Sequence, residues 1–286
     1  MRHRYTYTFR TIPDIQHLLQ PLDDAINNYF LPALTHNHLC SEVERELLSL
    51  PPKLGGLGII IPTKISSIEF QNSLKMTKNA QDNIISQNQS FQISHNKNIK
   101  NKIKMEKESR NKTTLNAIME NGSEEIRKCV EISQLNGASI WLTALPIKEE
   151  GFHLNKREFW DALALRYNWP IQYLPTTCVC GKPFDVSHSL SCKKGGYITI
   201  RHNEVRDITA ELLNEVCRNV HQEPALQPLT GELLRGNPNI SDEARLDVTA
   251  RDFWVKGQQA FFDVRVFNPF AKRHTKMSLK KSLEIN

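Results

Sequence analysis

Four residues with the side chains of zinc ligands lie within fifteen positions of one another. Cys178 and Cys180 are separated by one residue, and His188 and Cys192 follow. Three thiolates and one imidazole form a ligand set for tetrahedral structural zinc, although a single residue between two cysteines forces a tight chelate. Gly181 follows the second cysteine, so the backbone there is free to turn. The spacing predicts a structural zinc clip; the alternatives are a metal-free Cys/His group or a Cys178 to Cys192 disulfide.

Two aspartates form a second group with chemical potential. Asp247 ends an Arg-Leu-Asp triplet, and Asp263 begins an Asp-Val-Arg triplet about one hairpin later. Two such carboxylates hold one or two Mg²⁺ ions against a scissile phosphate, and Arg265 would stabilise the added negative charge. A third acid is expected from the preceding helix, with Glu204 preferred over Glu223. Surface ion pairing of Asp263 with Arg265 fits the same spacing, so both interpretations stay open at this point.

The elements that would position these carboxylates are a helix and two strands. Residues Asn203 to Val220 have apolar side chains at helical spacing, which places Glu204 in the first turn of a helix. Strands are predicted over Ala244 to Ala250 and over Ala260 to Phe267. Alternation along the second strand sends Asp263 and Arg265 to one face. We therefore expect a small mixed sheet with the helix across one face.

The N-terminal part of the chain favours helices. Asp14 to Phe30 carries a broad apolar face, Ser41 and Glu44 have the spacing of a capping box, and Pro51-Pro52 ends the second helix. The glycines at positions 55, 56 and 58 predict a turn into an extended segment and no phosphate cradle, because no Lys-Ser/Thr follows them. A further helix is expected from Asn155, and three tryptophans are expected in the core: Trp141, Trp160 and Trp169.

A basic connector separates these helices from the rest of the chain. Residues 73–113 are rich in Asn, Lys, Gln and Ser and carry nine Lys/Arg against three acids, which accounts for the formal net charge of +6. So few apolar side chains predict either disorder or one long solvated helix, with a domain boundary inside it. No apolar run reaches the roughly 18 residues that span a bilayer. The N-terminus lacks the apolar stretch of a signal peptide, so we expect an intracellular protein, nuclear or cytoplasmic, where reducing conditions favour metal over disulfide.

The chemical motifs follow one another in an order that resembles a known family. In the same order, such motifs occur in the C-terminal region of reverse transcriptase polyproteins from non-LTR-type retroelements that carry a restriction-like endonuclease. The upstream segments 30–35, 41–46 and 54–58 resemble the thumb-side end of the polymerase in those polyproteins. The downstream motifs are Cys178-Val-Cys180-Gly181, His188-Ser-Leu-Ser-Cys192, Gly195-Gly196-Tyr197, Arg201-His202-Asn203-Glu204, Glu223-Pro224, Arg245-Leu246-Asp247 and Phe261-Phe-Asp-Val-Arg-Val-Phe-Asn-Pro269.

The resemblance implies a zinc knuckle and a nuclease core of the PD-(D/E)xK kind, which nicks target DNA. It also implies structural zinc, catalytic Mg²⁺ and a nucleic-acid partner, DNA and also RNA, with no membrane or small-molecule substrate. Nucleic acid would contact Lys193, Lys194, Arg201 and His202. The family continues beyond the second catalytic strand, whereas the sequence stops at Asn286, so we expect a truncated core. No polymerase palm is expected, because Asp23-Asp24 lies in a helical pattern.

The sequence therefore predicts an α+β chain in five parts. These are a helical thumb remnant over 1–72, the connector over 73–113, a helical linker domain over 114–176, a CCHC zinc knuckle over 177–200 and an incomplete endonuclease core over 201–286. The expected function is that of a retroelement polyprotein fragment with a metal-dependent DNA endonuclease built on Glu204, Asp247, Asp263 and Arg265. The alternatives are a non-catalytic, zinc-containing nucleic-acid-binding module and a decayed, inactive copy.

Overall fold

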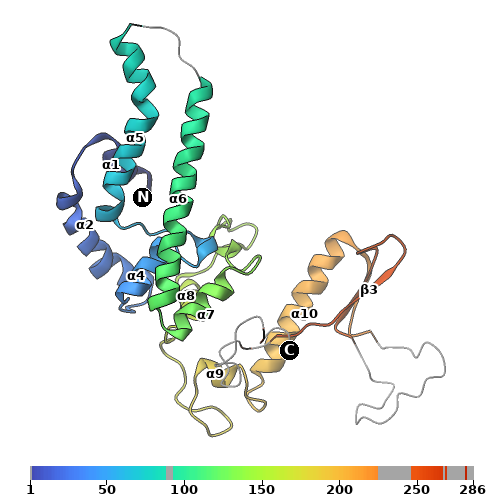
Figure 1. Cartoon of the computed structure of the whole chain (residues 1–286). Coiled ribbons are helices and arrows are strands. Elements are labelled where there is room, and N and C mark those ends of the chain that lie inside the picture. The colour runs from blue at the N-terminus through green and yellow to red at the C-terminus, as the bar shows by residue number, and fades with distance from the viewer. Residues whose placement is uncertain (1, 88–92, 225–245, 267, 269–280, 282–286) are drawn as a thin grey trace. The chain divides into compact units, whose positions relative to one another are not determined.

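The chain folds into two compact units, Met1–Ile171 and Gln172–Asn286, each described here by itself. The structure is a computed structural model that describes residues 2–87, 93–224, 246–266, 268 and 281. Its class is α+β: the described part of the chain contains many helices and one three-stranded antiparallel sheet (Figure 1).

The first unit begins with short helices, as predicted, but they are more broken than expected. Helix α1 (Arg2–Thr11) was not predicted. The single helix expected over Asp14 to Phe30 consists of a 3-10 turn, helix α2 (Gln20–Ala25) and a π turn, followed by α3 (Leu31–Leu34). Pro21 explains one break, because it lacks a backbone N–H and therefore favours the first turn of a new helix.

Helix α4 (Glu42–Ser49) confirms the predicted capping box. The Ser41 side chain accepts from the Glu44 amide, and the Glu44 carboxylate accepts from the Ser41 amide at 2.8 Å. The chain then turns through the glycines as expected, and the amides of Leu57 and Ile59 donate back to Leu48 O. Glycine is required at position 56, because a Cβ atom there would lie 2.0 Å from Leu50 O.

The described residues of the Asn/Lys-rich connector are mostly helical. They contribute to α5 (Pro62–Ile85) and α6 (Ile93–Asn121), which run alongside each other in Figure 1. Most of their side chains are exposed, as predicted for a solvated helix, but they belong to two helices and not to one long helix. An ion pair of 3.0 Å between Lys75 Nζ and Glu106 Oε2 links the two helices.

The core of the first unit lies where α4, α6, α7 (Glu124–Ser133) and α8 (Lys156–Tyr167) meet. Leu48 and Leu163 are fully buried there. Trp169 is buried and Trp141 packs at the edge of the core, which confirms two of the three predicted tryptophan anchors. The third, Trp160, lies outside this cluster; its indole donates to Ala33 O at 3.1 Å, and its ring stacks on His36.

The second unit contains α9 (Val186–Ser189), α10 (Tyr197–Val216) and the sheet, with strands β1 (Arg218–Gln222), β2 (Val248–Arg251) and β3 (Gln259–Phe262). The strand order is β1-β2-β3 and both pairings are antiparallel, so the predicted mixed sheet is wrong. The predicted helix over Asn203 to Val220 is also shifted, since α10 begins at Tyr197 after Gly196, whose φ is +75°. Strand β1 was not predicted, and β2 and β3 are shorter than expected.

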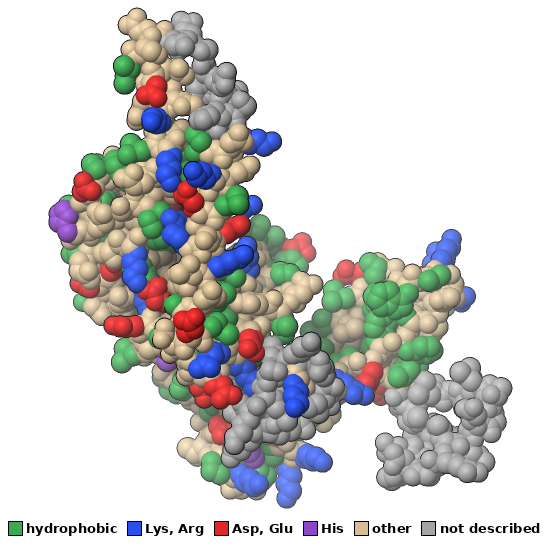
Figure 2. All heavy atoms as spheres, in the orientation of Figure 1, with side chains coloured by type: hydrophobic (Ala, Val, Ile, Leu, Met, Phe, Trp, Pro, Cys, Tyr) green, Lys and Arg blue, Asp and Glu red, His purple; other side chains and the backbone are tan. Residues whose placement is uncertain are grey.

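Helix α10 packs on the sheet through the face that carries Ala210 and Leu213. Ala210 and Leu213 contact Val248 and Ala250, and these four residues form the buried cluster of the unit. The small Ala210 side chain lets the helix approach the strands closely. Other large apolar residues of this helix are exposed, and hydrophobic side chains gather over it in Figure 2; they are Val205, Ile208, Leu212 and Val216. Among the described helices, none has the length and apolarity needed to cross a bilayer.

Candidate metal centre and carboxylate pair

The Cys/His cluster is built by a short turn and a short helix. The amide of Gly181 donates to Cys178 O at 2.8 Å, and the amide of Cys178 donates to Lys182 O at 2.9 Å. Gly181 has a φ of +81°, a conformation that favours glycine, and it closes the turn that holds Cys178 and Cys180 on one side. This local turn explains how two cysteines separated by one residue reach a common point.

Helix α9 brings the other two ligands to the same point. Asp185 caps its N-terminus by accepting from the His188 amide at 2.6 Å, and the Cys192 amide donates to His188 O at 2.8 Å. Next to the cluster, the rings of Phe184 and Tyr197 meet edge to face, with centroids 6.0 Å apart. Hydrogen bonds within the segment thus fix the distance between the third and fourth ligands.

The geometry of the cluster fits a tetrahedral metal ion. The ligand atoms of Cys178, Cys180, His188 and Cys192 all lie within 4.8 Å of one another. The two sulfurs of Cys178 and Cys192 are 3.7 Å apart, and Cys180 Sγ lies 3.2 Å from His188 Nε2. A zinc ion with sulfur ligands at about 2.3 Å requires sulfur separations of about 3.8 Å. These residues therefore could hold a metal such as zinc, and the cysteines are free thiols, not a disulfide.

The thiol of Cys192 differs electrostatically from the cysteines outside the cluster. Burial acts to raise the pKa of Cys192, but the amides of Lys194 and Gly195 hydrogen bond to its sulfur, and its pKa is lowered overall. Burial raises the pKa of Cys40 to about 11 and that of Cys129 to about 12. Amides that face a sulfur favour the thiolate, which is the form that binds metal.

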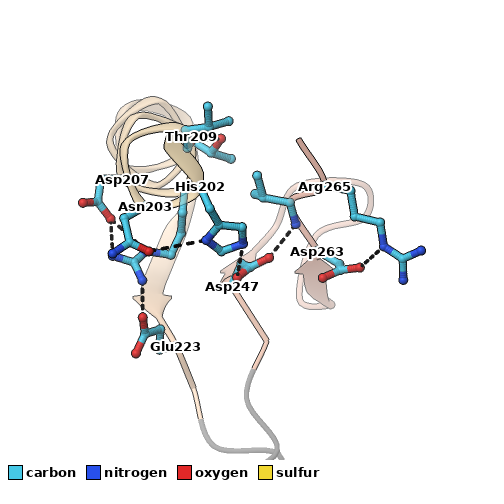
Figure 3. Close-up of polar contacts among 11 residues, drawn as sticks. His202, Asn203, Asp207, Thr209, Glu223, Asp247, Asp263 and Arg265 are labelled. Carbon is cyan, nitrogen blue, oxygen red and sulfur yellow. Dashed lines mark hydrogen bonds and ion pairs between the residues drawn. The ribbon is translucent and has the colours of Figure 1, made fainter. Parts of the chain in front are cut away.

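Asp247 lies between α10 and the end of β3. His202 Nε2 on α10 is 3.2 Å from Asp247 Oδ1, and the amide of Val264 donates to Asp247 Oδ2 at 2.5 Å. Figure 3 shows the imidazole of His202 reaching down from the helix to this carboxylate. The Asp247 side chain is 16% exposed, so it is largely shielded but still reachable. The sequence prediction for His202 was contact with nucleic acid; its approach to Asp247 was not foreseen.

Asp263 follows directly after β3, in the position that matches Asp247, the residue directly before β2. The register between these strands ends at the pair Val248 and Phe262, so Asp247 and Asp263 are the next residues on the two strands. Asp263 Oδ2 accepts from Arg265 Nε at 2.9 Å, and both side chains are largely exposed (Figure 3). The predicted alternation, which placed these two side chains on one face, agrees with this contact, although residues 263–266 continue the chain outside β3.

Two residues, Glu204 and Glu223, are candidates for a third acid. Neither carboxylate forms a metal-binding group with those of Asp247 and Asp263. Glu204 is exposed in the interior of α10, not in its first turn, because the helix begins at Tyr197. The Glu223 carboxylate pairs with Arg206, while its amide donates to Asp247 O at 2.9 Å. Among the described residues, the Cys/His cluster is the one group of three or more His, Cys, Asp or Glu side chains placed to hold a metal ion. Glu204, Asp247 and Asp263 therefore do not converge as a trio.

The residues predicted to contact nucleic acid differ in exposure. Lys193 and Lys194 are exposed beside the last ligand of the cluster. Arg201 is partly buried, and its guanidinium donates to Val266 O at 3.2 Å, which ties α10 to the segment after β3. Burial lowers the pKa of this guanidinium. Arg201 is thus placed to hold the backbone near the carboxylates.

Comparison of the chain with models of protein families, with curated proteins and with solved structures finds no match. The assignment of a function therefore depends on the site itself.

Proposed function

We propose that the second unit is a metal-dependent DNA endonuclease in which Asp247 and Asp263 hold Mg²⁺. One observation carries the proposal: two aspartates sixteen residues apart in sequence occupy matching positions at the ends of adjacent antiparallel strands. Magnesium is commonly held by one or two carboxylates, with substrate phosphate and water completing its coordination. A pair of carboxylates is therefore sufficient, and the identity of a third acid, Glu204 or Glu223, is a separate question.

The neighbouring side chains fit the roles that phosphodiester cleavage needs. Bound Mg²⁺ would neutralise charge on the scissile phosphate and lower the pKa of attacking water. His202 and the Val264 amide hold the Asp247 carboxylate in place. Arg265 pairs with Asp263 at an exposed position, where a phosphate could replace the carboxylate as the partner of the guanidinium. Breaking that pair would cost little, since exposed ion pairs contribute only about 0–1 kcal/mol.

The same proposal assigns structural zinc to Cys178, Cys180, His188 and Cys192. A structural site is closed, with all four positions taken by protein ligands, whereas a catalytic zinc site keeps one position open. The four side chains present complete a closed site. Zinc would then fix the segment that leads into α10, the helix that supplies His202.

The test is nicking of supercoiled plasmid DNA by the full chain with and without Mg²⁺. Asp247→Asn keeps an oxygen for the Val264 amide but removes the charge, so nicking should fall to the level of the magnesium-free reaction. Glu215→Gln, an exposed acid on α10, is the matched control and should nick like the parent. Asp247→Asn nicking as fast as the parent would overturn the assignment.

Further arms of the same assay sharpen the proposal. Glu204→Gln and Glu223→Gln, measured side by side, distinguish the two candidate third acids by which one slows nicking. A parent chain that binds DNA with steep salt dependence but never nicks it would favour the non-catalytic nucleic-acid-binding module instead. A parent chain that neither binds nor nicks would favour the inactive copy.

A further inference from the structure

The loop between β2 and β3 presents an exposed tryptophan. Residues 252–258 connect the two strands, and Trp254 within this loop is 79% exposed. Val255 is also exposed, as is Phe261 on β3. Exposed apolar patches mark interaction sites, and a ring of this size offers a large apolar face to a partner.

The loop is ordered by its own hydrogen bonds. The Asp252 amide donates to Gln258 O at 2.9 Å, and the Gln258 amide donates to Val255 O at 3.1 Å. Asp252 Oδ1 also accepts from the Gly257 amide. The Phe253 ring packs edge-on against Phe262, with centroids 5.0 Å apart, and the Trp254 ring meets Phe253 in the same way. Phe253 thus anchors the loop, while Trp254 is held outward.

The base of this loop carries an unfavourable pair of like charges. Arg218 on β1 and Arg251 on β2 are direct Cα partners in the antiparallel register, and both are exposed. Like charges directly opposite each other on a sheet are destabilising. The Asp252 carboxylate, 3.8 Å from Arg218 Nε, offsets this repulsion only in part. Lys256 adds a further exposed positive charge in the loop. An anionic ligand would remove the repulsion between the arginines.

We propose that this hairpin end binds single-stranded nucleic acid, with phosphates at Arg218 and Arg251 and a base stacked on Trp254. Single strands are bound by cations that follow the backbone and by aromatic rings on which bases stack. A phosphate satisfies the arginine pair and an unpaired base covers the ring, so one ligand class accounts for both features. The bases of an intact duplex are already stacked on one another and offer no free face.

This inference rests on the proposed nuclease in one respect. It identifies the nucleic acid that would lie beside the cleaved phosphate as a single strand. Asp247 and Asp252 are the residues directly before and after β2, and five residues correspond to about 16 Å of extended chain. A strand that runs along the hairpin would therefore place on Trp254 a base that lies a few nucleotides from the site of nicking.

The experiment measures binding of the full chain to a fluorescein-labelled oligothymidine of about 20 nucleotides, without Mg²⁺ and with zinc retained. Trp254→Ala should weaken binding about tenfold or more, because stacking of one base on an aromatic ring contributes about 1–3 kcal/mol. Trp254→Phe keeps an aromatic face and is the matched control, with affinity close to that of the parent. Equal affinity of Trp254→Ala and the parent would overturn the proposal.

The arginine pair is tested by salt dependence. The double variant Arg218→Gln with Arg251→Gln should bind more weakly and lower the slope of log K against log salt by about 1.4, since each phosphate contact with a single strand contributes about 0.7. Thermal unfolding should show that the variant is as stable as the parent or more so, because like-charge repulsion is removed. Tighter binding to duplex than to single strand, with no effect of Trp254→Ala, would contradict the assignment.

Failure of this inference is distinguishable from failure of the nuclease proposal. Glu215→Gln, the exposed acid on α10 that serves as the nicking control, should leave oligothymidine binding unchanged. A parent chain that binds oligothymidine through Trp254 and does not nick DNA overturns the nuclease alone. A parent chain that nicks DNA while Trp254→Ala binds oligothymidine normally overturns the single-strand site alone.

Discussion

Met1–Ile171 buries large apolar side chains from several helices in one core, whereas the described residues of Gln172–Asn286 form one buried apolar cluster of four residues between α10 and the sheet. The buried set of the first unit includes Leu48 and Leu163; that of the second unit includes two alanines, Ala210 and Ala250. Apolar burial stabilises a fold roughly in proportion to the area removed from water. The described residues of the second unit therefore gain less stabilisation from apolar burial than the core of the first unit does.

The Cys/His cluster offers the second unit a different source of stability. Small domains with limited cores commonly use a structural metal or disulfides. The cysteines of the cluster are free thiols whose positions fit a zinc ion. The contrast between the units thus yields an expectation: the first unit folds on apolar packing, and the second unit folds only with its metal bound.

The largest predicted effect is loss of the second unit on removal of metal. Cys192→Ser, or treatment with a chelator, should make residues after Gln172 sensitive to trypsin while the first unit remains resistant. The reason is that structural zinc contributes folding free energy of about 10–16 kcal/mol in small zinc-dependent domains. Metal analysis of the parent should find about one zinc per chain.

Cys217→Ser is the matched control, since Cys217 belongs to the same unit but lies outside the cluster. That variant should retain its zinc and its resistance to trypsin. Equal protease resistance of the parent with and without metal would show that the small core suffices and would remove the contrast between the units.

A smaller effect is expected from matched truncations in the two cores. Leu48 and Val248 are both fully buried, one in each unit. Leu48→Ala should lower the free energy of unfolding of the first unit by about 2–5 kcal/mol. Val248→Ala removes two methyl groups and should lower that of the second unit by about 1.5–2.5 kcal/mol, at about 0.8 kcal/mol for each carbon plus a small cavity cost.

Chemical denaturation followed by hydrogen exchange measures both units in the same sample. Each variant should shift only the exchange protection of its own unit. If Leu48→Ala also lowered protection in the sheet by the same amount, the two units would unfold as one. Their stabilities could then not be treated as separate.

Local signals in the sequence predicted local structure well. The capping box at Ser41 with Glu44 is confirmed, and the helix predicted from Asn155 begins with Asn155 as its N-cap, because such signals lie within a few residues of one another. The Cys/His cluster is likewise contained in one short segment, and its ligands converge as expected. Turns at glycines are also local features that the sequence predicted. Such features depend on backbone geometry within a few residues, which the sequence specifies directly.

Features that depend on distant partners were not predictable in the same way. The inner face of α10 is set by the sheet, which accepts Ala210 and Leu213 and leaves Leu212 exposed. Helical periodicity alone cannot distinguish two apolar stripes on one helix. Strand β1 has mainly polar, exposed residues and gives no alternating signal. The approach of His202 to Asp247 joins a helix to a strand end 45 residues later, and nothing in either segment specifies the other.

The smallest predicted effect concerns the charge of Glu44 in the first unit. Burial acts to raise the pKa of Glu44, but hydrogen bonds from the Ser41 amide, the Trp169 indole and the Ser41 hydroxyl, with His38 nearby, lower it overall. The Trp169 indole donates to Glu44 Oε1 at 2.5 Å, so the carboxylate joins α4 to the end of α8. Its ionised form therefore stabilises the fold.

A carboxyl group whose pKa is lower in the folded state contributes stability at pH values above its pKa in the unfolded chain, about 4.3. That contribution is lost as the pH falls through the folded-state pKa.

Glu44→Gln keeps an acceptor for the capping box but loses the charge, so it should lower the free energy of unfolding of the first unit by about 1 kcal/mol at pH 7. The difference from the parent should shrink steadily below about pH 4. Glu108→Gln, which changes an exposed acid in the interior of α6, should follow the parent at every pH. A constant difference between Glu44→Gln and the parent from pH 7 to pH 3 would mean that the variant acts through packing and that the Glu44 charge does not stabilise the first unit.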